Sequence, residues 1–254
     1  MAGAQLGVVA LLGLSMTFLQ FAIGALNDVH DAPADAATDR VPPKPIPAGL
    51  VSADVGRLVV VASASIGLGL AALFGSALLV LAGVVLVIGF GYDLVAKGTA
   101  WSWLPFAIGI PILPVYGWFG ATGMVADWTV GLVPAAALVG AALALANALA
   151  DVERDMASGI TTIVTKLGVQ WSRRALVGTW AGAVAIALGW LVADGASAMR
   201  LAAFVPAVSV VLGGVVLAWS GGPGRREWGW RVQAVGAGLT AVAWLTVVAS
   251  ATGG

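Results

Sequence analysis

Two short acidic stretches hold the residues of this sequence that could do chemistry. One begins at position 27 and reads NDVHDAPAD. Within it Asn27, Asp31 and Asp35 lie four residues apart, so on a helix their side chains share one face. Asp28 lies one residue off that face and can lean toward it. Carboxylates this close repel one another unless a cation sits among them. Oxygen-only clusters of this kind suit Mg²⁺, which commonly bridges carboxylates to substrate phosphates.

The same pattern occurs a second time, in the stretch NALADVERD. Asn147, Asp151 and Asp155 repeat the order asparagine, aspartate, aspartate at the same spacing. A single acidic motif at a helix end would be interpreted as ordinary solvated polar residues. Two copies favour a functional cluster, because charged groups near the hydrocarbon region of a membrane are expensive and are usually functional.

The composition places these motifs in a membrane protein. Of the 254 residues, 60% are hydrophobic and only 9% are charged, whereas soluble domains carry about 25% charged residues. We therefore expect an all-α fold, a polytopic transmembrane bundle of about eight helices. The absence of cysteine excludes thiol chemistry, and a single histidine excludes a multi-histidine metal site. The expected helices are residues 3–26, 55–74, 76–92, 102–119, 129–150, 175–193, 201–220 and 232–250.

The placement of charge predicts the orientation of these helices. If they alternate in direction, the loops after the first, third, fifth and seventh helices lie on one side, and these loops with their flanks hold every lysine and arginine except Arg200. By the positive-inside rule that side is cytoplasmic. Both acidic motifs then face the cytoplasm in a multi-pass protein of the cell membrane. Their separation by four helices also implies parallel halves, 1–120 and 121–254, within one domain spanning 1–254.

Prolines and glycines predict local features of the helices. The segment 102–119 contains three prolines, so we expect it to be bent or broken. The pairs Gly67 with Gly69 and Gly236 with Gly238 are interpreted as sites of close helix packing rather than of phosphate binding.

Cations near the acidic motifs extend the interpretation from a metal to a substrate. Lys44, Lys97 and Lys166 can act as point charges, and Arg154 as a bidentate donor, toward a diphosphate. Both motifs would then hold Mg²⁺ at one cytoplasmic-side cavity, where neutralising the diphosphate lets its carbon–oxygen bond ionise. The apolar helices would hold an allylic chain and keep water from the carbocation.

These residues also resemble a known family. The stretches NDVHDAPAD, KPIPAG, GYDLVAK at 91–97 and NALADVERDMASGITTIVTKLG at 147–168 are similar to the UbiA superfamily of intramembrane prenyltransferases. Its members are helical bundles that transfer a prenyl group from a prenyl diphosphate, with Mg²⁺ held by two Asp-rich motifs. The resemblance extends from the first helix to about Gly168. The family usually has nine helices, one of them before the first motif, so either this sequence begins late or the protein lacks that helix.

Carried over by position, the resemblance implies roles for individual residues. Tyr92 and Lys97 match the family's Tyr-x-x-x-x-Lys segment, while Arg40 and Lys44 lie where the family often has two arginines around prolines. The expected metal ligands are Asp28, Asp31, Asp35, Asp151 and Asp155. The expected catalytic residues are Asp31, Asp35, Asp151, Asp155 and Tyr92. The residues expected to bind diphosphate are Asn27, Arg40, Lys44, Lys97, Asn147, Arg154 and Lys166.

Three nearby polar residues are expected to lie beside the shared faces of the motifs rather than on them. His30 lies off the shared face of the first motif and is expected to face solvent or to lie beside the cluster. Glu153 points away from the aspartates of the second motif, and we expect a surface ion pair with Arg154 or Arg174. Asp93 could orient a neighbouring site residue or could be an interfacial loop acid.

Several functions are compatible with this sequence. A prenyltransferase would pass its prenyl group to an aromatic ring, as in quinone biosynthesis, or to another lipophilic acceptor. A terpene cyclase on the same scaffold would instead trap the cation with double bonds of the substrate itself. An ion-coupled transporter is less favoured, because it requires acids near the bilayer midplane rather than at helix ends. The expected partners are a prenyl diphosphate, a lipophilic acceptor and membrane lipids, without nucleic acid. The sequence does not predict the oligomeric state.

Overall fold

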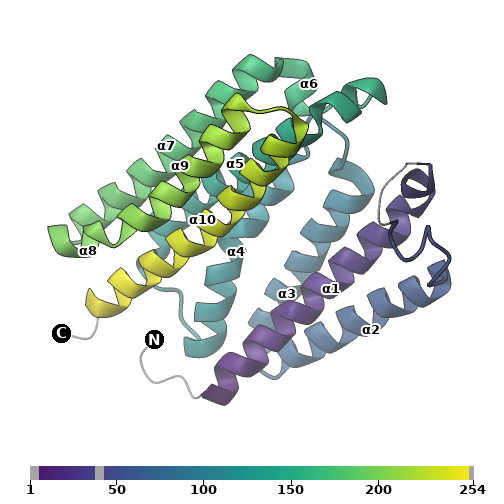
Figure 1. Ribbon diagram of the computed structural model, residues 1–254. Helices are drawn as coiled ribbons and strands as arrows, with labels where there is room; N and C mark the ends of the chain where they lie inside the picture. The colour runs from purple at the N-terminus through teal and green to yellow at the C-terminus, as the bar shows by residue number, and fades with distance from the viewer. Residues whose placement is uncertain (1–5, 38–42, 252–254) are drawn as a thin grey trace. The chain divides into compact units, whose positions relative to one another are not determined.

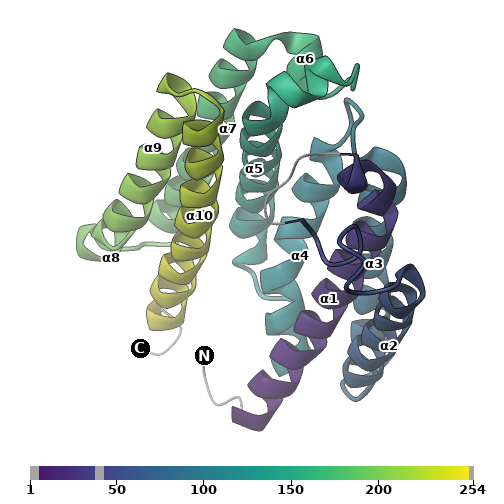
Figure 2. The ribbon, with the colours of Figure 1, turned by 45° about the vertical axis from the view of Figure 1, so that its right-hand side comes forward.

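The computed structural model describes residues 6–37 and 43–251. Within this part of the chain, eight helices are long and apolar enough to cross a membrane, as expected from the sequence. The chain divides into two compact units (Figures 1 and 2). The N-terminal unit comprises the described part of residues 6–97 together with 112–125, and the C-terminal unit comprises residues 98–111 and the described residues from 126 onward.

Three helices and a π-helical turn form most of the N-terminal unit. They are α1 (Leu6–Ala36), α2 (Ala53–Ala72), α3 (Ser76–Gly91) and the turn η1 (Tyr92–Ala96). Helix α1 packs along α2, and α3 lies beside both (Figures 1 and 2). Ser52 caps the start of α2, because its side chain accepts a hydrogen bond from the Val55 amide at 3.3 Å. Apolar side chains from these helices form one core with the buried Tyr116.

Glycine allows the close approach of α1 and α2. A Cβ atom at Gly67 would lie 2.8 Å from the side chain of Leu19, whereas one at Gly69 would meet nothing within 4 Å. The second pair, in the C-terminal unit, is likewise unequal. A Cβ atom at Gly236 would lie 2.6 Å from the side chain of Val211, whereas one at Gly238 would meet nothing within 4 Å. Residues two apart on a helix point in nearly opposite directions. Each predicted glycine pair therefore contributes one packing position.

The C-terminal unit is built around one long, well-buried helix, α5. Helices α7 and α10 pack against it, and α9 lies along α10 (Figures 1 and 2). Gly214 and Gly229 bring α9 and α10 together, since a Cβ atom at Gly214 would lie 2.8 Å from the Gly229 carbonyl oxygen. The elements are α5 (Thr129–Ala157), α6 (Ile163–Leu167), α7 (Val169–Ala193), α8 (Ala198–Ala202), α9 (Phe204–Ser220) and α10 (Pro223–Ala251).

Helix α4 (Trp103–Thr122) runs without interruption through its three prolines, so of the expected bend or break the break is wrong, and the bend stays a prediction. Pro105 lies in the first turn, where the missing amide hydrogen has no intrahelical acceptor in any case. The boundary between the two units falls inside this helix, between Pro111 and Ile112.

Both motif-bearing helices extend further than their apolar segments. Helix α1 continues to Ala36 rather than ending at residue 26, and α5 continues to Ala157 rather than ending at residue 150. Hydropathy locates the apolar part of a helix, whereas backbone hydrogen bonding continues into the polar turns. The acidic motifs therefore lie within helices, so their residues spaced four apart share one helix face, as predicted.

Candidate active site

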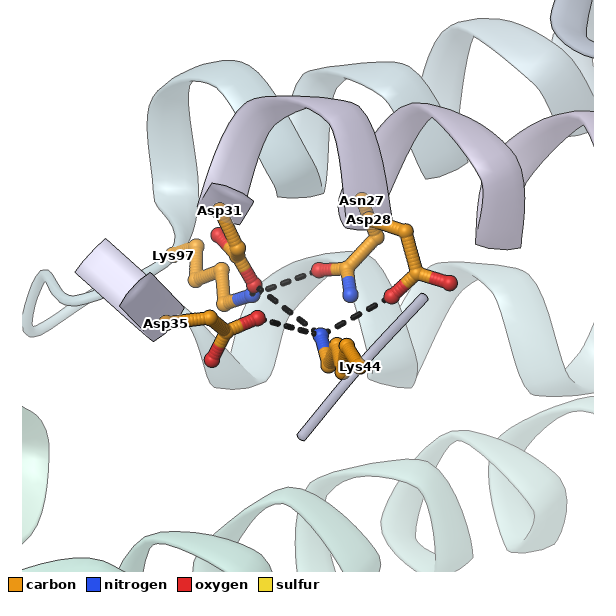
Figure 3. Close-up of polar contacts among 6 residues, drawn as sticks. All are labelled: Asn27, Asp28, Asp31, Asp35, Lys44 and Lys97. Atoms are coloured by element: carbon orange, nitrogen blue, oxygen red, sulfur yellow. Dashed lines mark hydrogen bonds and ion pairs between the residues drawn. The ribbon is translucent and has the colours of Figure 1, made fainter. Parts of the chain in front are cut away.

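The first acidic motif occupies the last turns of α1 (Figure 3). Asn27, Asp31 and Asp35 follow one another along the helix, and Asp28 lies next to them, as their spacing predicts. The side chains of Asp31 and Asp35 are 20% exposed, and that of Asp28 is 46% exposed. His30 is exposed. The motif therefore presents half-buried oxygen atoms on one face of the helix.

Lys44 lies among the carboxylates of this motif (Figure 3). Its Nζ atom is 2.9 Å from Asp28 Oδ1 and 2.8 Å from Asp35 Oδ2. Asp31 Oδ2 lies 4.0 Å from the same atom. Burial by itself would lower the pKa of Lys44, but the hydrogen bonds and charges of Asp35 and Asp28 together outweigh burial and raise this pKa above its ordinary value of 10.5. Lys44 is therefore a cation at physiological pH.

Lys97 brings η1 to the same motif. Its Nζ atom donates a hydrogen bond to Asn27 Oδ1 at 2.5 Å and forms an ion pair with Asp31 (Figure 3). The backbone amide of Lys97 donates to the Tyr92 carbonyl oxygen at 2.8 Å, which closes a π-helical turn. The predicted Tyr-x-x-x-x-Lys segment is thus a single turn, with the half-buried Tyr92 at its start.

Asp93, next in the chain after Tyr92, is only 3% exposed. This burial argues against an exposed interfacial acid, one of its two predicted roles. Its Oδ2 atom has no hydrogen-bond partner among the described residues.

The second acidic motif occupies the last turns of α5, in the C-terminal unit. Asn147, Asp151 and Asp155 are all partly buried, so they form one stripe along the helix as predicted. Arg154 Nη1 lies 3.3 Å from Asp151 Oδ1. Lys166, on α6, is exposed and forms no ion pair with another described residue.

Glu153 does not pair with Arg154 or Arg174 as expected. Its two carboxylate oxygens accept hydrogen bonds from Arg226, at the start of α10. Arg154 is next to Glu153 in the sequence and Arg174 lies on α7, whereas the actual partner, Arg226, is brought near by the packing of α10 against α5. The sequence therefore did not predict Arg226 as the partner of Glu153. The only local signal at this position is the pair of adjacent arginines at 225–226.

The structure thus gathers the predicted residues into two groups. The N-terminal unit holds Asn27, Asp28, Asp31, Asp35, Lys44, Tyr92 and Lys97, and the C-terminal unit holds Asn147, Asp151, Arg154, Asp155 and Lys166. Arg40 lies outside the described residues.

The donors of the first motif suit a hard divalent cation in their chemistry. Among the described residues, no group of three or more histidine, cysteine, aspartate or glutamate side chains is arranged as a metal site. The carboxylates share lysine ammonium groups instead. Nevertheless Asp28, Asp31 and Asp35 all reach one atom, Lys44 Nζ, within 4.0 Å. Oxygen atoms that converge on one cation in this way match the ligand preference of Mg²⁺.

Solved structures share this fold over nearly the whole chain. The apo structure of a UbiA homologue from Aeropyrum pernix K1 aligns with a TM-score of 0.79 at 21% identity, covering 95% of this chain and 90% of that one. A UbiA homologue from Archaeoglobus fulgidus bound to GPP and Mg²⁺ aligns with a TM-score of 0.72 at 16% identity, covering 95% and 89%. A structure of digeranylgeranylglyceryl phosphate synthase aligns with a TM-score of 0.74 at 13% identity, covering 96% and 86%. At these identities the likeness establishes the fold. No curated protein matches the chain.

The eight long, apolar helices of the described residues are those of a multi-pass membrane protein. Residues 2–231 match the model of the UbiA prenyltransferase family. The chain belongs to this family and is a transferase.

Proposed function

We propose that the protein ionises a prenyl diphosphate, with Mg²⁺, and transfers the prenyl group to an aromatic or other lipophilic acceptor. The observation that carries this proposal is the repeated stripe of one asparagine and two aspartates on α1 and α5, each with a basic side chain in contact. Family membership supports the reaction class. The solved UbiA homologues bound to GPP or DMAPP with Mg²⁺ support the substrate and the metal.

In the proposed reaction, Lys44 and Lys97 bind oxygen atoms of the diphosphate and counter its charge. The bond between the prenyl carbon and the diphosphate oxygen breaks, and its electron pair leaves with the diphosphate. The acceptor then donates an electron pair to the allylic cation and releases a proton. Tyr92, half-buried beside Lys97, is proposed to face the reacting end of the prenyl group.

Mg²⁺ ligands are proposed in both motifs: Asp28, Asp31, Asp35, Asp151 and Asp155. The bound metal would supply positive charge that stabilises the departing diphosphate. Asn27, Asn147, Arg154 and Lys166 are proposed as further contacts to the diphosphate, and Arg40 as one more. We further propose that both motifs lie on the cytoplasmic side that the charge distribution predicts. The parallel-halves hypothesis stays a prediction from the equal spacing.

A terpene cyclase is the second candidate function. It shares the ionising machinery and differs in what captures the cation. Products therefore separate the two: a cyclic hydrocarbon or alcohol formed without acceptor indicates cyclisation, whereas product that forms only with an acceptor indicates transfer.

The deciding experiment measures diphosphate release by purified protein in detergent with Mg²⁺ and an allylic prenyl diphosphate, with and without aromatic acceptors and EDTA. We expect release that depends on Mg²⁺ and a fall of at least about 100-fold in Asp31→Asn and in Asp151→Asn, as when charge-stabilising groups are removed from other enzymes. The matched control is Asp194→Asn, which makes the same change at an exposed acid. Substantial activity in either motif variant would contradict the site assignment.

A further inference from the structure

Arg226 is a buried cation at the start of α10, with 5% of its surface exposed. Its guanidinium donates to both carboxylate oxygens of Glu153 and, at 3.2 Å, to the Gly221 carbonyl oxygen. Taking a guanidinium out of water is costly unless a carboxylate is paired with it. Glu153 provides this carboxylate, and its own side chain is 57% exposed.

Glu153 lies midway between the two aspartates of the second motif. On a helix, two positions correspond to a rotation of about 200°. Glu153 therefore projects from the side of α5 opposite Asp151 and Asp155. Its ion pair with Arg226 therefore holds the face of these helical turns that lies opposite the motif.

The last turn of α5 contributes no buried side chain to the core of this unit. Val152 is the last buried residue of the helix, and the residues that follow are exposed, except for the partly buried Asp155. Before Val152, apolar contacts with α7 and α9 fix the helix, because Leu149 and Val152 belong to the core of this unit. Beyond it, the Glu153–Arg226 pair joins this helix end to the start of α10. The turn that carries Asp155 is thus attached by an ion pair rather than by core packing.

We propose that Glu153 and Arg226 are positioning residues, whose ion pair fixes the rotation of the last turns of α5 so that Asp151 and Asp155 face the diphosphate. The role of these aspartates rests on the proposed function. The ion pair itself touches neither substrate nor metal and acts only through the helix.

The kinetic test compares Glu153→Gln and Arg226→Lys with a matched control, Glu227→Gln. Glu227 forms an exposed ion pair with Arg231 at 2.5 Å, so its variant loses an ion pair of the same helix without touching α5. We expect both pair variants, in protein that is still folded at the assay temperature, to raise the Mg²⁺ concentration for half-maximal activity about 10-fold. The exchanged pair Glu153→Arg with Arg226→Glu should recover part of the loss. A loss of activity that merely follows a loss of folded protein, or no change in the Mg²⁺ requirement, would overturn the proposal.

A second test does not depend on activity. The chain has no cysteine, so Met156→Cys, at a 66% exposed position on the last turn of α5, accepts a single spin label. We expect Glu153→Gln to increase the mobility of this label in the electron paramagnetic resonance spectrum, and Glu227→Gln to leave it unchanged. An unchanged label in Glu153→Gln would overturn the positioning role. If the wild type released no diphosphate, the proposed function would fail while this measurement still tested the attachment.

Discussion

Lys97 forms an ion pair with Asp31 although 66 residues separate them in the chain. The contact joins η1 to the last turns of α1, and the same ammonium group donates to Asn27. The acidic motif and the Tyr-x-x-x-x-Lys segment therefore form one polar cluster within the N-terminal unit. Because Lys97 already contacts motif residues, its side chain is positioned where a diphosphate bound to the motif would need a cation.

This contact predicts that Lys97 and Asp31 act as a unit. Lys97→Met should lower kcat/KM for the prenyl diphosphate about 10-fold or more, because it removes a charge that we propose stabilises the leaving group. In Asp31→Asn the same lysine change should cost much less, giving a coupling energy of about 1 kcal/mol or more. Steady-state kinetics of the four proteins of this cycle measure the coupling. Additive effects would show that the two residues act independently.

Lys44 is expected to contribute to substrate binding. It is the cation that three motif carboxylates reach, so Lys44→Met should raise KM for the prenyl diphosphate about 10-fold and leave those carboxylates to repel one another. Arg57→Met is a suitable control, because within the described part of the chain Arg57 pairs only with the neighbouring, exposed Asp54 in a local ion pair. An unchanged KM in Lys44→Met would remove Lys44 from the binding site.

The raised pKa of Lys44 also predicts how stability depends on pH. A lysine whose folded-state pKa exceeds its ordinary value of 10.5 stabilises the fold fully below that pH, and the contribution is lost as the pH rises through the folded-state pKa. The difference in melting temperature between wild type and Lys44→Met should therefore stay constant from about pH 7 to about pH 9 and shrink above about pH 10.5. A difference that already shrinks near pH 8 would contradict the ion pairs with Asp28 and Asp35.

The sequence was sufficient for features that repeat or depend on local spacing. Eight apolar segments predict the eight spans, and the four-residue spacing of Asn27, Asp31 and Asp35 predicts their common face. The sequence alone could not predict which distant residues helix packing brings together. Glu153 pairs with Arg226 across 73 positions, whereas the partners predicted from the sequence were Arg154 or Arg174. The continuity of a helix also depends on its tertiary surroundings. Helix α4 is continuous although Pro111 and Pro114 lie in its interior, where proline weakens a helix.

Close packing predicts a stability effect at Gly140 of α5. A Cβ atom there would lie 2.2 Å from the Phe106 carbonyl oxygen, which belongs to the backbone of α4 and cannot rotate away. Gly140→Ala should therefore reduce the free energy of unfolding by about 1–3 kcal/mol, as overpacking commonly does. In Gly83→Ala the added methyl group meets nothing within 4 Å, so stability should be unchanged or slightly higher because alanine favours the helix. Thermal unfolding of both variants in the same detergent compares them, and equal melting temperatures would argue against this contact.

The buried pair of Ser15 and Tyr116 predicts an unequal effect of two conservative changes. Ser15 Oγ donates to the Gly67 carbonyl oxygen at 2.7 Å, which uses its only hydrogen. Tyr116 must therefore be the donor in the 2.6 Å hydrogen bond between the two hydroxyl groups. Tyr116→Phe removes that donor while Ser15 keeps its bond to Gly67, so the cost should be about 1 kcal/mol.

Ser15→Ala is different, because it leaves the hydroxyl of a tyrosine that is 1% exposed without its acceptor. An unsatisfied buried donor costs about 1–3 kcal/mol, so Ser15→Ala should lower the melting temperature more than Tyr116→Phe does. Adding Tyr116→Phe to Ser15→Ala should then recover stability, since the orphaned hydroxyl is removed. Melting temperatures of the two single variants and the double variant test this order. A double variant less stable than Ser15→Ala would mean that the tyrosine hydroxyl has a second acceptor.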